Sequence, residues 1–320
     1  MPERCPSVFL LVPGPWPDVP AIVSALAAGG VVADPTGDGP IAAGQVRVER
    51  IVSDGIADAF TWGRRGRLAD PLVARIRHAP SAALLEVGHL LHEKPGLLAR
   101  IGRSLQAGGG VAIRTEGSGA AIAWPEWLAA CDAGDSWSMA DVSVLVVGDE
   151  GGGAFTCGMH MFGHPDVQVP FADLHESRRW LDALCAYQIL EDPTLLSGHT
   201  FAPDADTPRH DLERWPDGMH DPEDGRHNPL GVWRVLSDGA PALQMEAPVH
   251  FIPSLAALLM ARERAKGDAL TEAEVEEVVA RATCITVEPA HVIQLERARG
   301  YVDIEPRRAW AQWKLIRRQD

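Results

Sequence analysis

The segment Gly153–Val169, GAFTCGMHMFGHPDVQV, constrains the fold more than any other part of the chain. After a short apolar start, it places two further glycines, Gly158 and Gly163, and a proline among apolar and polar side chains. Gly158 and Gly163 allow a positive φ or a close approach of the backbone to a neighbour. Pro165 pushes the residue before it towards an extended conformation. The segment therefore predicts a strand that ends in a tight, bent turn before the next element begins.

Two interpretations of this turn follow from its side chains. In the structural interpretation, Met159, Met161 and Phe162 fill the core and His160 caps the turn. In the functional interpretation, the turn is a ligand or interaction site, and its polar side chains are the candidates. These side chains are His160, His164 and Asp166.

Length and element order indicate the fold class. A chain of 320 residues exceeds the usual domain of roughly 100–200 residues, and its 46% of hydrophobic and 23% of charged residues are average for globular proteins. Predicted strands cover 8–12, 46–52, 56–62 and 82–87, and predicted helices cover 19–28, 71–78 and 95–106. The order strand, helix, strand, strand, helix, strand is that of a ferredoxin-like unit.

This order can recur in the second part of the chain. Predicted strands cover 111–115, 142–147, 154–161 and either 231–236 or 241–246, with helices at 124–131 and 171–190. A long polar loop is expected at 197–229, and helices at 253–264 and 271–282. The second of these helices opens with the capping-box pattern Thr271-Glu-Ala-Glu274.

The fold expected from these elements is α/β (α+β), with mixed β-sheets in tandem ferredoxin-like units and a C-terminal helical appendage. The first unit is expected at 1–107 and the second at 108–250. The helical tail then covers 251–320.

The formal net charge of −15 bears on the choice of partner. A field of that sign repels phosphate backbones and anionic membrane surfaces, so neither nucleic acid nor a membrane is expected as a partner. A basic protein partner fits the charge better. The other interpretation is that the charge only keeps the protein in solution.

Cysteines and the N-terminal residues indicate a compartment. The five cysteines are odd in number, widely separated and mostly set among apolar neighbours, which is typical of buried thiols in a reducing compartment. The apolar run at 8–12 is broken by Pro13, Pro15 and Pro17, so it predicts neither a signal peptide nor a membrane span. We therefore expect a cytoplasmic location.

The central segment carries a family resemblance. Thr156–Val167 is similar to the Gly-Met-x-x-Phe-Gly-x-Pro-[Asp/Glu] signature of a bacterial family known as domain of unknown function 4261. Ala112–Gly119, Trp124–Trp127 and Leu190–Thr200 also resemble segments of that family, so the resemblance covers about residues 8–246. The family has no established activity, and the resemblance implies a fold neighbourhood without a mechanism.

Histidines in the polar loop raise a metal hypothesis. His210, His220 and His227 lie among carboxylates such as Asp221, and this set can hold zinc or a similar divalent ion. No His-Glu-x-x-His helix fixes two ligands on one face, so the primary expectation is a solvated loop and no cofactor.

Catalysis would need a nucleophile or an acid–base pair. The best candidates are Glu116 and Ser118, in a small-residue turn after a predicted strand. The Gly117-Ser118-Gly119 turn lacks the strand–turn–helix pattern of a nucleophile elbow. A turn that merely closes a strand onto a helix is the other interpretation.

Two tryptophans near the C-terminus are interaction candidates. Trp310 and Trp313 lie three residues apart on a predicted helix, which therefore has an apolar stripe to bury against its own fold or against a partner. The primary functional hypothesis is a non-catalytic protein-binding, accessory or immunity-like factor. The alternative is a metal-dependent or acid–base hydrolase that uses the 210–227 loop and the 158–166 turn.

Overall fold

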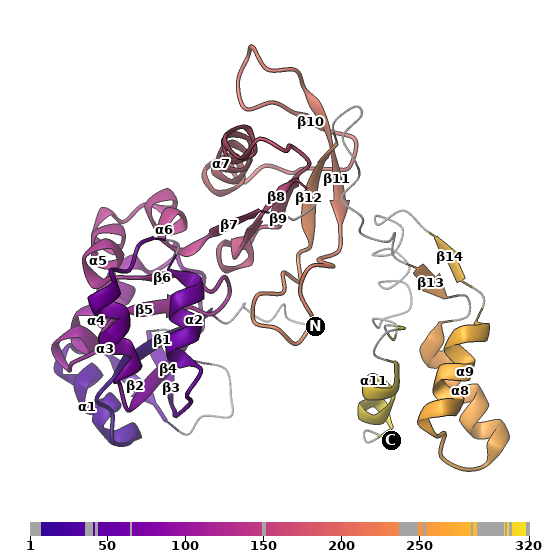
Figure 1. Ribbon diagram of the computed structural model, residues 1–320, viewed down its shortest axis with the longest axis horizontal. Coiled ribbons are helices and arrows are strands. Elements are labelled where there is room, and N and C mark those ends of the chain that lie inside the picture. Colours follow the sequence, from indigo (N-terminus) through magenta and orange to yellow (C-terminus); the bar gives the residue numbers. More distant parts are fainter. Residues whose placement is uncertain are drawn as a thin grey trace. The chain divides into compact units, whose positions relative to one another are not determined.

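The computed structural model divides the chain into two compact units, residues 1–243 and 244–320 (Figure 1). The structure describes residues 8–35, 41, 44–64, 66–148, 152–236, 249–251, 254–282, 284–286, 304, 306 and 309–317. Two mixed six-stranded sheets lie in the first unit and combine with helices. The α+β class predicted from the sequence is therefore confirmed.

The first sheet has the strand order β2-β3-β4-β1-β5-β6. Its strands are β1 (Val8–Gly14), β2 (Val32–Asp34), β3 (Gln45–Ile51), β4 (Ser81–Val87), β5 (Ile113–Thr115) and β6 (Ala121–Ile122). The central strand β1 is antiparallel to both β4 and β5, so that Leu10 lies opposite Leu85 and Thr115. Because β1 is apolar along most of its length, both of its faces have to be covered.

Helices provide this cover on both faces of the first sheet. They are α1 (Val19–Ala28), α2 (Ile56–Gly63), α3 (Asp70–Arg77), α4 (Pro95–Ala107) and α5 (Trp124–Ala133). Leu10 shares a core with α1, α4 and α5. The next residue, Leu11, points to the opposite face and shares a second core with α2 and α3.

The second sheet has the strand order β10-β11-β12-β9-β8-β7. Its strands are β7 (Leu145–Gly148), β8 (Ala154–Cys157), β9 (Asp166–Val169), β10 (Thr200–Phe201), β11 (His210–Trp215) and β12 (Val232–Leu236). The long helix α7 (Leu174–Glu191) buries Trp180, Leu181 and Leu184 in the same core as Val167 and Trp233 of this sheet.

The second unit is largely helical. Its described elements are β13 (Val249–Phe251), α8 (Leu255–Lys266), α9 (Glu272–Arg281), β14 (Cys284–Thr286) and α11 (Ala309–Ile316). The predicted capping box of α9 is confirmed, since the Glu274 amide donates to Thr271 Oγ1 at 3.4 Å and the Thr271 amide donates to Glu274 Oε2 at 2.7 Å. The antiparallel pair β13–β14 was not expected from the sequence.

One predicted strand was wrong. Residues 56–62 form α2, because Ile56, Phe60 and Gly63 recur at helical spacing and are buried together. The turn at 53–55 therefore leads into a helix and not into a hairpin. The tandem ferredoxin-like arrangement is not confirmed, since β2 and β3 are parallel neighbours and β4 lies between β3 and β1.

Three further differences concern boundaries and loops. Asp135 is the N-cap of helix α6 (Ser136–Ser143), because its side chain accepts a hydrogen bond from the Ser138 amide at 2.8 Å. The end of this helix overlaps the start of the strand expected at 142–147. Strand β11 crosses the segment expected as a loop. The unit boundary expected at 107 falls inside the first sheet, because β5 pairs with β1. The alternative strand at 241–246 lies outside the described residues.

The turn between β8 and β9 joins the cores of the two sheets. It folds as the single 3-10 turn η1 (Met159–Phe162), flanked by Gly158 and Gly163 at φ 114° and 83°. Met159 belongs to the core of the second sheet, whereas Met161 and Phe162 belong to the core of the first. The Leu91 amide also donates to the Met161 carbonyl at 3.0 Å. The structural interpretation of these apolar side chains is therefore confirmed.

Replacing Gly158 should destabilise this connection. A Cβ atom there would lie 2.7 Å from Ser118 Cβ and 2.9 Å from Met161 Cε, in addition to the cost of a positive φ. We expect Gly158→Ala to lower the free energy of unfolding by about 3 kcal/mol. The control is Gly134→Ala at φ 72°, where the added Cβ meets nothing within 4 Å and only about 1 kcal/mol should be lost. Urea unfolding of both variants tests this, and equal losses would contradict it.

Candidate functional site

Three segments that are distant in the sequence meet beside η1. They are the turn at 115–119 after β5, the segment 157–163, and the loop at 217–228, and we call their meeting point the histidine junction. Cys157 Sγ lies 3.8 Å from the Gly117 carbonyl, and a Cβ atom built on Gly117 would lie 2.7 Å from His160 Nε2. A Cβ atom on Gly225 would lie 3.6 Å from the Glu116 carbonyl. The structure thus brings together the turn of Glu116, the 158–166 turn and the histidine-rich loop.

Asp166 is the buried anchor of the junction. Its Oδ1 accepts from Thr156 Oγ1 at 3.0 Å and from the Met159 amide at 3.2 Å, and its Oδ2 accepts from Asn228 Nδ2 at 2.7 Å. Burial raises the pKa of this carboxyl group to about 7, although the three hydrogen bonds act to lower the pKa. Asp166 therefore ties a strand, a turn and a loop together from a position that solvent does not reach.

Asp217 organises the loop from the other side of Asn228. Its Oδ2 accepts from the Asn228 amide at 2.9 Å, and its Oδ1 accepts from the Met219 amide at 2.9 Å. The same carboxylate lies 3.1 Å from His220 Nδ1 and 3.6 Å from His227 Nδ1. Burial acts to raise the pKa of Asp217, but the hydrogen bonds from His220, Asn228 and Met219 outweigh it, so the pKa is lowered.

His220 connects Asp217 to a thiol. With Nδ1 held by Asp217, the other ring nitrogen of His220 lies 3.9 Å from Cys157 Sγ. A carboxylate, an imidazole and a thiol in this order match the orienting group, the base and the nucleophile of covalent catalysis. However, Cys157 is only 1% exposed, and burial raises the pKa of its thiol well above the usual range. In this arrangement the thiol stays protonated and out of reach of a substrate.

His160 lies on the inner side of the junction. Burial lowers the pKa of His160 to about 4, so its ring is neutral at pH 7. Burial also lowers the pKa of His164, the other histidine of the turn, whose charged neighbours are Asp192 and His92. The turn therefore brings His160, and not the ring of His164, towards the loop histidines.

The candidate catalytic residues of the 115–119 turn have structural partners. The Ser118 hydroxyl is fully buried and lies 2.9 Å from Thr115 Oγ1, and it accepts from the Ala120 amide at 3.0 Å. The Glu116 carboxylate forms an ion pair with Arg114. Both side chains close the turn, as the structural interpretation of this segment predicts.

The structure does not assemble the metal-ligand set predicted from the sequence. His210 packs on the far side of the loop against Trp180 and Phe171, at ring-centroid distances of 5.1 and 5.8 Å. Asp221 is exposed and accepts from the Glu223 amide at 2.9 Å. Within the described part of the chain, no group of three or more His, Cys, Asp or Glu side chains is placed to hold a metal ion. Of the predicted set of His210, His220, Asp221 and His227, the structure brings two histidines together at Asp217 and places His210 and Asp221 elsewhere.

The two C-terminal tryptophans differ in their surroundings. Trp313 is only 2% exposed and shares a core with Leu259 of α8 and Val275 of α9, so α11 is buried against its own unit. Trp310 is partly buried, and Lys314 Nζ lies 5.1 Å above its ring. Trp313 is thus a core residue and is not available as a contact for a partner.

Comparisons with family models, with curated proteins and with solved structures find no match to this chain. The resemblance to domain of unknown function 4261 therefore stays a prediction. Among the helices of the described residues, none is both long and apolar enough to cross a membrane. The site has to be interpreted from its own geometry.

Asp166 and His160 should make opposite contributions to the pH dependence of stability. Between about pH 4 and 7 the folded protein holds a proton on Asp166 that the unfolded chain releases, so this group lowers the free energy of unfolding as pH rises. Between about pH 4 and 6.5 the unfolded chain holds a proton on His160 that the folded protein lacks, so this group raises the free energy of unfolding as pH rises.

Single substitutions should separate the two contributions. From pH 4.5 to 6.5, we expect the stability of Asp166→Asn relative to the wild type to increase by up to about 1.4 kcal/mol per pH unit, whereas that of His160→Gln decreases by a similar amount. Urea unfolding at several pH values gives both slopes. Curves that run parallel to the wild type would show that neither group titrates as its burial predicts.

Proposed function

We propose that this protein is a non-catalytic binding or accessory factor, immunity-like in character, that recognises a basic protein in the cytoplasm and takes neither nucleic acid nor a membrane as its partner. The observation that carries the proposal is the closed state of the histidine junction. The side chains there with chemical potential are 0–8% exposed and are held by contacts within or between the three segments; they are Ser118, Cys157, Asp166 and Asp217. Groups that could do chemistry here hold the fold together instead.

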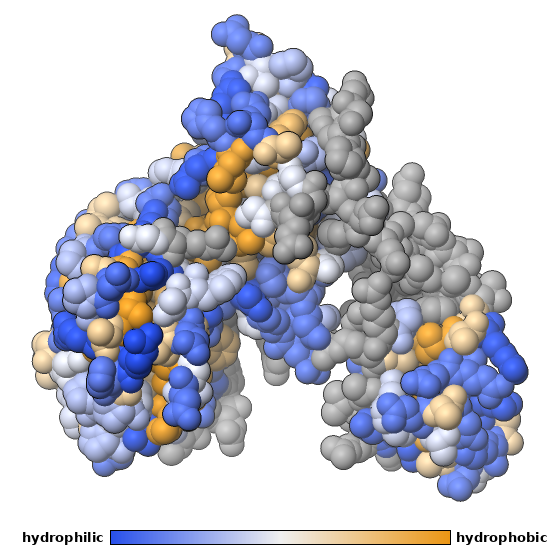
Figure 2. Space-filling view, in the orientation of Figure 1, coloured by the Kyte–Doolittle hydropathy of each residue, from blue (hydrophilic) through white to orange (hydrophobic). Residues whose placement is uncertain are grey.

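The surface around the second sheet supports a basic partner. Residues 204–226 contain eight acidic side chains and three arginines. Several of the carboxylates are exposed on β11 or on the segments that flank it, and Figure 2 shows a predominantly hydrophilic surface over the tip where β10 leads towards β11. Exposed charge of one sign speeds encounter with a partner of the other sign and disfavours partners of like charge.

Neutralising this acidic segment should remove partner binding. The variant replaces four exposed acids, Asp206→Asn, Asp211→Asn, Asp221→Asn and Glu223→Gln. We expect a basic protein to co-purify with the wild type at about 0.05 M salt and to be lost at about 0.5 M, because salt screens the attraction between exposed charges. The variant should fail to retain this protein at either salt concentration, because the attracting charges have been removed. Quantitative mass spectrometry of native purifications from the source cells measures this.

A matched variant controls for total charge. It removes four exposed acids elsewhere in the first unit: Glu49→Gln, Asp54→Asn, Asp58→Asn and Glu191→Gln. This control should retain the partner at low salt. A partner that both variants lose equally would show a response to net charge alone, and a wild type without any salt-sensitive partner would contradict the proposal.

The second candidate function is a metal-dependent or acid–base hydrolase, which the Asp217–His220–Cys157 line favours. Cys157 Sγ and His220 Nε2 are 3.9 Å apart, close to the separation of two ligands on one tetrahedral zinc ion. A metal-bound thiolate would also overcome the raised pKa of the thiol.

Elemental analysis of the purified protein tests this candidate. If the hydrolase candidate is correct, we expect about one zinc or similar ion per chain in the wild type. The bound metal should be lost in His220→Ala and its amount reduced in His227→Ala. His175→Ala, which removes an exposed histidine at the start of α7, should keep the metal. A folded wild type without bound metal would contradict the metal-dependent version.

A further inference from the structure

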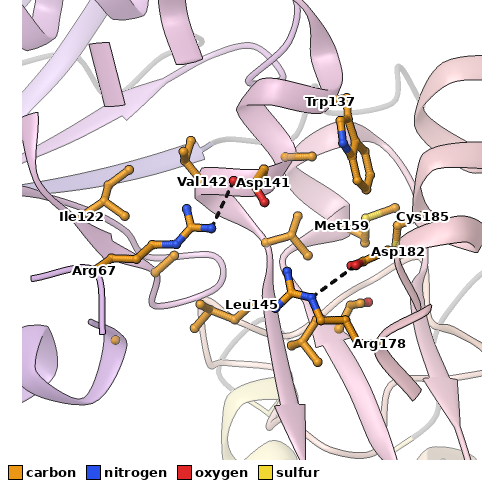
Figure 3. Close-up of a pocket in the computed structure, with 16 residues that line it drawn as sticks. Arg67, Ile122, Trp137, Asp141, Val142, Leu145, Met159, Arg178, Asp182 and Cys185 are labelled. Atoms are coloured by element: carbon orange, nitrogen blue, oxygen red, sulfur yellow. Dashed lines mark hydrogen bonds and ion pairs between the residues drawn. The ribbon is translucent and has the colours of Figure 1, made fainter. Parts of the chain in front are cut away.

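A cavity separate from the histidine junction lies between the two sheets of the first unit. Its volume is about 270 Å³, and its walls come from β6, α6, β7, η1 and α7 (Figure 3). An engineered apolar cavity of about 150 Å³ is known to hold benzene, so by volume this one has room for about ten non-hydrogen atoms. It therefore approaches the lower end of the range of small-molecule sites.

One part of the cavity wall is apolar. Ile122, Val142 and Leu145 line it from the first sheet, α6 and β7, and Met159 and Trp137 complete it. Apart from the partly buried Trp137, these side chains are almost fully removed from solvent. An occupant with a hydrocarbon or aromatic body would bury its surface against these side chains, and the polar remainder of the wall calls for a polar group on the same molecule.

Two arginines reach the cavity from different elements, and they differ in what they already bind. Arg67 lies 3.1 Å from Asp141 and 3.9 Å from Glu126. Arg178 uses Nε alone, at 3.2 Å from Asp182. Within the described residues its two terminal nitrogens form no hydrogen bond, and Figure 3 shows its guanidinium group at the cavity. These nitrogens carry four of the five donors of the side chain.

The formal charges of the cavity wall balance, with two arginines against Asp141 and Asp182, so the preference for an anion rests on unused hydrogen-bond donors. Asp141 and Asp182 each already accept a hydrogen bond from an arginine. The free donor capacity belongs to Arg178, and a guanidinium group binds a carboxylate through two parallel hydrogen bonds.

We propose that this cavity binds a small amphipathic carboxylate, with an apolar body of about eight carbon atoms inside the cavity and the carboxylate on the terminal nitrogens of Arg178. The site goes beyond the proposed binding of a basic protein, because its charged groups lie outside the acidic segment and it shares only the Met159 and Thr156 wall with the surroundings of Asp166.

Octanoate tests the proposal, with octanamide and octylamine as neutral and cationic probes of nearly the same size. We expect saturable binding of octanoate by calorimetry at pH 7, at least about tenfold tighter than that of octanamide. Arg178→Gln should weaken octanoate about tenfold and change octanamide by less than about twofold. Leu145→Trp, which fills the cavity, should abolish the binding of both.

Arg103→Gln is the matched control. Arg103 is 52% exposed and paired with Asp132, whereas Arg178 is 57% exposed and paired with Asp182, so both substitutions remove one exposed, singly paired arginine. The control should bind octanoate as the wild type does. Absence of saturable binding, equal binding of octanoate and octanamide, or tighter binding of octylamine would each overturn the proposal. The arginine variants change only exposed positions, so their result holds even where Leu145→Trp does not fold.

Discussion

The buried carboxyl group of Asp166 is the interaction on which the arrangement around the second sheet depends. A group that is 2% exposed has to find its hydrogen bonds inside the protein, and Asp166 receives three of them. The donors come from β8, from the first residue of η1 and from the end of the 217–228 loop. One acceptor therefore fixes three segments relative to one another, and its loss would leave three donors without a partner, which costs more than a single surface hydrogen bond.

Charge in the histidine junction is confined to few positions. Burial favours the neutral form of both Asp166 and His160, although it raises the pKa of one and lowers that of the other. The Cys157 thiol is held neutral for the same reason. Asp217 stays charged because backbone amides and His220 donate to it. Among the buried groups of the junction, the charge of Asp217 is therefore paired, and these groups are set for holding segments together rather than for attacking a substrate.

Local signals in the sequence predicted the elements that local chemistry determines. Helical spacing predicted the helix Val19–Ala28, and the capping-box pattern at Thr271 predicted the start of α9. The Asp18 cap of the first helix is a further local signal that the structure adds. An Asp-Gly turn before an apolar run is shared by hairpins and helix starts, which is why α2 was taken for a strand. At the site, residue type alone singled out His220, but Cys157 lies 63 positions away in the chain. No spacing rule predicts that Cys157 and His220 meet, because only the tertiary fold brings them together. For the same reason, the sequence does not show that His210 packs against aromatic rings.

Met159 links the cavity to the histidine junction. Its side chain lines the cavity, and its amide donates to Asp166. Thr156 likewise lines the cavity and donates to Asp166 through its hydroxyl group. If an occupant displaced either residue, the hydrogen bonds of Asp166 would change, and Asn228, which bonds to both Asp166 and Asp217, would carry that change to the loop. Because coupling between two sites is reciprocal in free energy, a partner held by the acidic segment around this loop would alter the affinity of the cavity by the same factor.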